Sequence, residues 1–91
     1  MKTKTVLSVL GKDRQGIVAT IATTLYEAGA NIDDIKQTIL GEMFSMTMLV
    51  TADEDTCGFN ELQERLALDG ERLGLQITLQ REDVFTFMYK V

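Results

Sequence analysis

The sequence predicts an α+β fold in which four antiparallel strands form one sheet and two helices cover one face of it. Three observations support this prediction. The chain has 91 residues, which is enough for one domain. Four short stretches are rich in β-forming or alternating apolar residues, whereas two other stretches carry apolar residues at helical spacing. In chain order, these stretches indicate strand, helix, strand, strand, helix and strand.

The first half of the chain contains two strands and the helix between them. Residues 3–10 are expected to form a strand, because valine, threonine and leucine dominate this stretch. A helix is expected from Ile17 to Ala28, with Gly29 at the position where a left-handed residue commonly ends a helix. Residues 31–40 carry isoleucines among polar residues and are expected to form the second strand. The apolar residues of the helix recur at spacings of four, four and three: Ile17, Ile21, Leu25 and Ala28.

The second half begins with Gly41-Glu42, a pair typical of a hairpin turn. Residues 43–52 alternate so that one face of the expected strand is wholly apolar. The acidic run Asp53-Glu54-Asp55-Thr56 ends this strand and is expected to cap a second helix, whose positive end favours carboxylates. The apolar stripe of that helix consists of Phe59, Leu62, Leu66 and Leu73. The last strand is expected where Leu75, Ile77 and Leu79 alternate with polar residues.

This order gives two right-handed βαβ crossovers joined by a hairpin, with both helices on one face of a four-stranded antiparallel sheet. Such an arrangement is the ferredoxin-like sandwich, and residues 1–91 are expected to form a single domain of this kind. The aromatic tail 84–91 fits a strand or a helix, of which a short helix is favoured. Because its apolar side chains are costly to expose, the tail is expected to pack on its own sheet or on a partner.

Composition and charge exclude several classes of function. The formal net charge is −5, made up of +1 on residues 1–40 and −6 on the residues that follow. The chain should therefore repel the phosphate backbone of nucleic acids. No apolar run approaches the ~20 residues of a membrane span, and the N-terminus lacks the features of a signal peptide, so a cytoplasmic protein is expected. The chain has one cysteine, Cys57, and no histidine. Neither an internal disulfide nor a metal site or cofactor is therefore expected.

The loop Gly11-Lys12-Asp13-Arg14-Gln15-Gly16 is the strongest candidate for a binding site, because it leads directly into the first expected helix. A helix N-terminus has unpaired N–H groups and a partial positive charge, which suit a carboxylate or phosphate. Asp13 could receive an ammonium group, and Arg14 could bind a carboxylate through two hydrogen bonds. Asn31 is expected to complete this site with its amide. The alternatives are a tight turn that binds nothing and a solvated surface arginine.

Two motifs resemble the signatures of an ACT domain. Gly11-Lys12-Asp13-Arg14-Gln15-Gly16-Ile17-Val18 looks like the opening of such a domain, and Ala28-Gly29-Ala30-Asn31-Ile32 looks like its second signature. The chain is similar to stand-alone, single-domain ACT proteins and to the ACT repeats of the glycine cleavage repressor. The resemblance implies a ferredoxin-like fold, regulation by amino acids, and pairing of subunits with ligands at their interface. The family often has proline at the position of Gln15, and a glutamine there makes the loop more flexible than a proline would.

Carried over by position, the resemblance implies a set of ligand-binding residues in the loop and at the start of the second strand. These are Asp13, Arg14, Gln15, Gly16, Ile17, Val18, Asn31 and Ile32.

These observations favour a non-catalytic regulatory module that binds a small molecule, with an amino-acid sensor acting as a homodimer as the specific hypothesis. The alternative is a structural or adaptor domain that dimerises or binds a protein partner without a ligand. An enzyme is not expected. An acylphosphatase would need an arginine at the start of the first helix, where the sequence is Ile17-Val18-Ala19-Thr20, and the chain has no histidine to act as a base.

Overall fold

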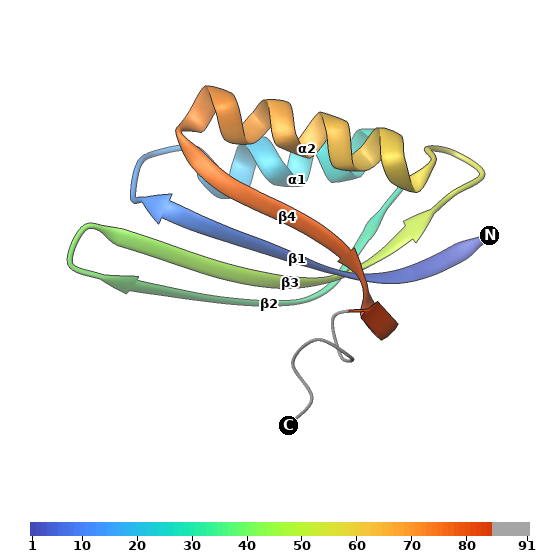
Figure 1. Ribbon diagram of the computed structural model, residues 1–91, viewed down its shortest axis with the longest axis horizontal. Coiled ribbons are helices and arrows are strands. Elements are labelled where there is room, and N and C mark those ends of the chain that lie inside the picture. The colour runs from blue at the N-terminus through green and yellow to red at the C-terminus, as the bar shows by residue number, and fades with distance from the viewer. Residues whose placement is uncertain (85–91) are drawn as a thin grey trace.

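The computed structural model describes residues 1–84, which form one four-stranded sheet with two helices on one of its faces (Figure 1). The strand order is β2-β3-β1-β4, and all neighbouring strands are antiparallel. This arrangement confirms the ferredoxin-like fold. The elements are β1 (Lys2–Lys12), α1 (Ile17–Glu27), β2 (Asn31–Leu40), β3 (Met43–Asp53), α2 (Phe59–Leu73) and β4 (Leu75–Arg81).

The observed elements extend or shorten the expected ones by one or two residues. Pairing with β3 lengthens β1 at both ends, so that it runs from Lys2 to Lys12. Gly29 has a φ of +72°, which confirms its expected place just after α1. Of the tail 84–91, only Val84 lies within the described residues. None of the helices in residues 1–84 has the length and apolar character that a membrane span requires.

The hydrophobic core lies between the two helices and the sheet face that they cover. On β3, every second side chain points into it, as the alternation predicts. On α1, Ile17, Ile21 and Leu25 are buried at the expected helical spacing. The largest fully buried apolar side chains are Leu7, Ile21, Leu25, Met46, Met48, Leu62, Leu66, Val9 and Val50.

The acidic run does not provide the N-cap residue of α2, but the carboxylate of Glu54 accepts the backbone N–H of Phe59, the first residue of that helix. The helix begins at Phe59, and its N-cap residue, Gly58, makes no side-chain hydrogen bond. The strand continues to Asp53, because Asp53 still pairs with Lys2 of β1. Strand pairing therefore places Asp53 at the end of the central strand β3, several residues ahead of the helix.

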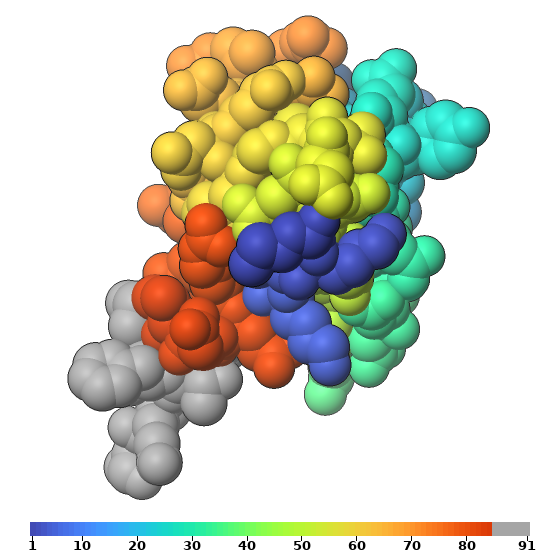
Figure 2. Space-filling view, turned by 90° about the vertical axis from the view of Figure 1, so that its right-hand side faces the viewer, coloured from blue at the N-terminus to red at the C-terminus, as the bar shows by residue number. Residues whose placement is uncertain are grey.

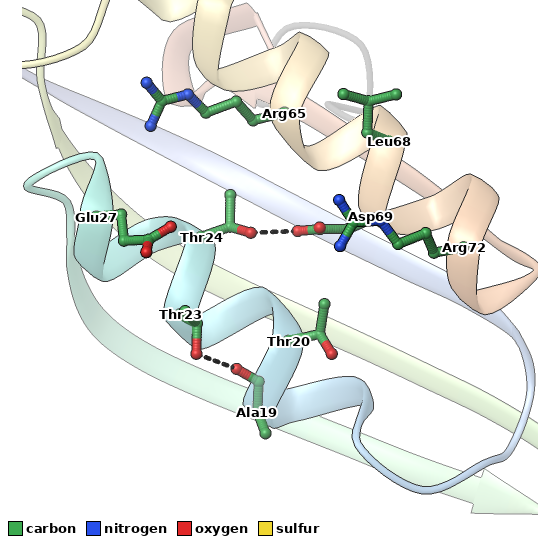
Figure 3. A pocket seen from close by; sticks show the side chains of 9 residues that line it. All are labelled: Ala19, Thr20, Thr23, Thr24, Glu27, Arg65, Leu68, Asp69 and Arg72. Carbon is green, nitrogen blue, oxygen red and sulfur yellow. Dashed lines mark hydrogen bonds between the residues drawn. The ribbon is translucent and has the colours of Figure 1, made fainter.

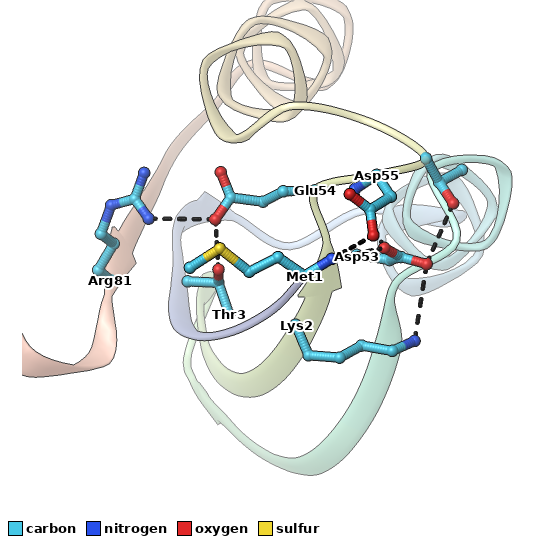
Figure 4. A network of polar contacts seen from close by, with 8 residues as sticks. Met1, Lys2, Thr3, Asp53, Glu54, Asp55 and Arg81 are labelled. Atoms are coloured by element: carbon cyan, nitrogen blue, oxygen red, sulfur yellow. Dashed lines mark hydrogen bonds and ion pairs between the residues drawn. The ribbon is translucent and has the colours of Figure 1, made fainter.

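The acidic run also binds groups at the start of β1 and the end of β4 (Figure 4). Glu54 accepts a hydrogen bond from the Thr3 hydroxyl and another, of 3.4 Å, from the guanidinium of Arg81. The carboxylate of Asp53 accepts the backbone N–H of Asp55 at 3.1 Å. Figure 2 shows the dark blue start of the chain between the yellow-green segment after β3 and the red end of β4. This polar network connects three segments that are far apart in the sequence.

The polar network predicts that the protein loses stability in acid. Hydrogen bonds from Thr3 and then Arg81 hold the pKa of Glu54 below its usual 4.5, and the N–H of Asp55 holds the pKa of Asp53 below its usual 3.8. A carboxylate whose pKa is lowered by folding stabilises the folded state fully above its unfolded pKa. This stabilisation is lost as the pH falls through the lower, folded value. We therefore expect the melting temperature to decrease as the pH falls below about 4.5.

The contribution of Glu54 can be isolated by comparing two charge-neutralising variants. Glu54→Gln should lower the melting temperature at neutral pH and make its decrease in acid shallower than in the unmodified protein. Glu64→Gln, an exposed position on α2, should retain the original pH profile. Melting curves recorded by circular dichroism across this range provide the measurement. If the Glu54→Gln profile is parallel to that of the unmodified protein, Glu54 does not contribute in this way.

Candidate functional site

The loop between β1 and α1 is held by the turn between β2 and β3. The backbone N–H of Asp13 donates a hydrogen bond of 2.7 Å to the carbonyl oxygen of Glu42. No side chain caps the N-terminus of α1, and its first turn contains no acidic residue. The N–H groups of this turn therefore have no side-chain acceptor, and the positive end of the helix dipole is not neutralised from within the helix.

The two glycines of the loop are required by the fold itself. Gly16 has a φ of +83°, a conformation that other residues rarely adopt, although a Cβ atom there would meet nothing within 4 Å. A Cβ atom on Gly11 would lie 2.5 Å from Cδ2 of Leu75. Gly16 thus serves the backbone conformation, and the space beside Gly11 is filled by a side chain of β4. Neither glycine by itself indicates a ligand.

A cavity of about 580 Å³ lies against the loop and includes three of the predicted site residues. Asp13, Arg14 and Gln15 line it together with Lys12. Its other wall is formed by Leu73 and Gly74 at the end of α2, which the sequence reasoning missed. These two residues reach the loop because β4 pairs beside β1, with Leu75 opposite Gly11. The sequence contains no local signal that the end of α2 lies beside the loop, because this contact depends on the order of the strands in the sheet.

Two further predicted residues, Ile17 and Val18, lie in the first turn of α1. Ile17 is only 3% exposed and packs in the core, so its side chain is not available to a ligand. Val18 is exposed at the surface of the helix. For Ile17, the backbone N–H is therefore the one group that could contact a ligand at this end of the helix.

Within one chain, the structure does not bring Asn31 and Ile32 to the loop. Asn31 pairs with Thr51, which pairs with Lys4 of β1. From Lys4 to the start of the loop after Lys12 is eight residues of strand, or about 26 Å. The amide of Asn31 donates instead to Asp33 at 2.7 Å.

The topology explains this separation. A βαβ crossover returns the chain to the end of the sheet where the first strand began. Residues that precede α1 and residues that follow it therefore lie at opposite ends of the sheet, as Figure 1 shows for the loop after β1 and the start of β2. The side chain of Ile32 is half-buried and packs against the core.

A second cavity, of about 790 Å³, lies between α1 and α2 (Figure 3). On its floor, the Thr24 hydroxyl donates a hydrogen bond to the carboxylate of Asp69, which is 5% exposed. This site was not among those predicted, although the sequence contains a signal for it. Asp69 stands three residues after Leu66 on the buried stripe of α2, where an apolar residue is expected. The lining residues are Ala19, Thr20, Thr23, Thr24, Glu27, Arg65, Leu68, Asp69 and Arg72.

The remaining chemical groups suit structure rather than reaction or metal binding. Burial raises the pKa of the Cys57 thiol, with a smaller contribution from the carboxylate of Glu61. Its reactive thiolate form is therefore disfavoured at neutral pH. Within residues 1–84, no three histidine, cysteine, aspartate or glutamate side chains are placed so that they could hold a metal ion.

Comparison with known proteins identifies the family. The sequence matches the ACT domain over residues 3–80. A UPF0237 protein from Methanopyrus kandleri is 45% identical over 89 residues, which are 98% of this chain and 99% of that protein. The solved structure of an ACT domain protein from Streptococcus pneumoniae has a TM-score of 0.77 and 36% identity, covering 91% of this chain and 93% of that one.

A longer protein contains a similar fold. The crystal structure of a putative glycine cleavage system transcriptional repressor has a TM-score of 0.79 and 25% identity, covering 89% of this chain and 46% of that one. The fold, the two sequence motifs and these matches agree. The chain therefore belongs to the ACT domain family, whose members are regulatory domains that bind small molecules.

Proposed function

We propose that this chain is a non-catalytic regulatory module that binds an amino acid in the loop cavity and acts as a homodimer. The observation that carries the proposal is the cavity at the N-terminal side of α1, where Asp13 and Arg14 lie side by side in the chain and both line the wall. Its volume of about 580 Å³ is within the usual range for small-molecule sites. Membership of the ACT domain family supports the regulatory role.

The cavity offers one group for each charge of an amino acid. The guanidinium of Arg14 suits the carboxylate, because it can donate two parallel hydrogen bonds. The carboxylate of Asp13 suits the ammonium group. Gln15 can donate and accept hydrogen bonds, and Leu73 provides an apolar surface for the ligand side chain.

The homodimer is supported by the surface of β2. Within residues 1–84, this strand is at the edge of the sheet, and its backbone groups on the outer side have no partner strand. Ile35 is 42% exposed, Ile39 56% and Leu40 79%, although residues of this size are usually covered. Pairing of two β2 edges would cover these side chains and satisfy the backbone groups.

Such pairing would also give Asn31 a place in the site. If two β2 strands pair antiparallel along their full length, Asn31 of one subunit lies beside Leu40 of the other. The adjoining β2–β3 turn contains Glu42, whose carbonyl oxygen accepts the N–H of Asp13. Asn31 and Ile32 would thus approach the loop of the second subunit. A ligand that contacts both subunits would favour one dimer geometry over others, which is a means of regulation.

We propose that the module has no catalytic activity of its own. The chain contains no histidine, which is the commonest general base at neutral pH. Its one cysteine is buried and has a raised pKa, so it is poorly suited to act as a nucleophile.

A titration of the twenty amino acids tests this function. At least one of them should raise the melting temperature and release or absorb heat on binding, since a ligand that prefers the folded state stabilises it by mass action. Arg14→Gln should weaken that binding by about tenfold or more, because a charge-assisted hydrogen bond is lost. Lys2→Gln, which removes one positive charge at the opposite end of β1, is the matched control and should bind normally.

The oligomeric mass should be measured with and without the amino acid that binds. A dimer in the presence of the ligand supports the proposal. If none of the twenty amino acids stabilises the protein, the sensor function is wrong. A dimer that forms regardless of ligand would then favour the second candidate, a structural or adaptor domain, for which the exposed apolar side chains of β2 are the specific evidence.

A further inference from the structure

The cavity between α1 and α2 is lined by a row of alternating charges. Arg65, Asp69 and Arg72 follow one another on α2 at spacings of four and three residues, which places them on one face of the helix. This face is directed toward α1, whose threonines Thr20, Thr23 and Thr24 form the opposite side (Figure 3). The cavity is thus polar and carries both signs of charge.

Asp69 is the negative group at the floor of this cavity. The residue is 5% exposed, and its carboxylate accepts a hydrogen bond from the hydroxyl of Thr24. Within residues 1–84, no lysine or arginine forms an ion pair with it. A buried carboxylate without a positive partner is costly, so Asp69 is suited to receive an ammonium group from a ligand.

Arg72 is the positive group on the rim. Its side chain has no hydrogen bond or ion pair with any other residue in the described part of the chain. Arg65, in contrast, donates to Glu61 at 2.5 Å. The guanidinium of Arg72 is therefore the group that can bind a carboxylate beside Asp69.

The cavity also has an apolar side and sufficient room. Leu68 is 54% exposed although it lines the cavity, and Ala19 lies on the wall provided by α1. The volume of about 790 Å³ is within the range of small-molecule sites. A short aliphatic side chain in contact with Leu68 would remove apolar surface from water on both molecules.

We propose that the cavity between α1 and α2 is a second binding site, for a small zwitterion with a short aliphatic side chain, in which Asp69 binds its ammonium group and Arg72 its carboxylate. This site is separate from the loop cavity and does not depend on it. The lining residues of the two cavities have none in common.

The test uses L-alanine, L-valine and L-leucine as probes of the full chain at millimolar concentration, followed by the backbone amide signals in NMR spectra. At least one probe should shift the signals of residues 19–27 and 65–72. Arg72→Gln should weaken this binding by about tenfold or more, and Asp69→Asn, which retains an acceptor for the Thr24 hydroxyl, should do the same. Lys2→Gln should leave the affinity unchanged. N-acetyl-L-valine and L-valinamide, each lacking one of the two charges of L-valine, should bind more weakly than L-valine.

Arg14→Gln separates this proposal from the loop site. If shifts at residues 19–27 and 65–72 persist in Arg14→Gln and disappear in Arg72→Gln, the second site is established whatever happens in the loop. If Arg14→Gln abolishes all shifts, or if none of the three probes shifts signals between the helices, the second site is wrong. Equal affinity of Arg72→Gln and Lys2→Gln would overturn it as well.

Discussion

Leu66→Ala is expected to lower the free energy of unfolding by about 2–5 kcal/mol, the largest effect among the variants considered. Leu66 lies in the middle of α2 and is 1% exposed. Its side chain belongs to the core between the helices and the sheet. The loss consists of the apolar transfer free energy of the missing atoms and the cost of the cavity that they leave.

Leu68→Ala provides the matched control, since it removes the same atoms two residues further along the same helix. Leu68 is 54% exposed, so its truncation should change the free energy of unfolding by no more than about 0.5 kcal/mol. Urea denaturation followed by circular dichroism gives both values. If the two variants are equally stable, α2 does not face the sheet in the way described. Because α2 also provides Leu73 to the loop cavity, Leu66 supports the candidate site indirectly.

The fold could be predicted from the sequence because its signals are local. The alternation along β3 and the helical spacing of Ile17, Ile21 and Leu25 each determine one buried face. The handedness of the crossovers then leaves few ways to arrange six elements. The acidic run was harder to place, because pairing with β1 extends β3 through Asp53, and only Glu54 of this run reaches the first N–H of α2.

The site could be predicted only in part, because a binding site is formed by residues that are distant in sequence. The loop with Asp13 and Arg14 could be proposed because its residues are consecutive, and a cavity lies against it. The wall formed by Leu73 depends on β4 lying beside β1, which no residue of the loop indicates. Asn31 lies far from the loop of its own chain, because a residue that follows α1 returns to the end of the sheet where β1 starts.

The hydrogen bond between Thr24 of α1 and Asp69 of α2 corresponds to a signal in the sequence. On the stripe of α2, Leu62, Leu66 and Leu73 are apolar and Asp69 is not. A charged residue at a buried position requires a partner, and the facing helix provides one in Thr24. Neighbouring Thr23 directs its hydroxyl to the carbonyl oxygen of Ala19 within its own helix, at 2.8 Å. Two adjacent threonines therefore have different roles.

Thr24→Val is expected to lower the free energy of unfolding by about 1–3 kcal/mol. The substitution keeps the β-branched shape and nearly the same helix propensity, but it removes the hydroxyl that donates to Asp69. Asp69, a residue that is 5% exposed, would then have lost the hydrogen-bond donor that α1 provides to its carboxylate. Leaving a buried acceptor without its donor costs more than the hydrogen bond contributes when both partners are present.

Thr23→Val is the matched control on the adjacent residue of α1. Thr23 is exposed, and its bond to Ala19 joins atoms of one helix, where the carbonyl oxygen already accepts within the helix or from water. Its replacement should change the free energy of unfolding by no more than about 0.5 kcal/mol. Urea denaturation of both variants distinguishes the two roles. If Thr23→Val is destabilised as much as Thr24→Val, the loss is a property of threonine in this helix, and the contact between Thr24 and Asp69 does not hold the two helices together.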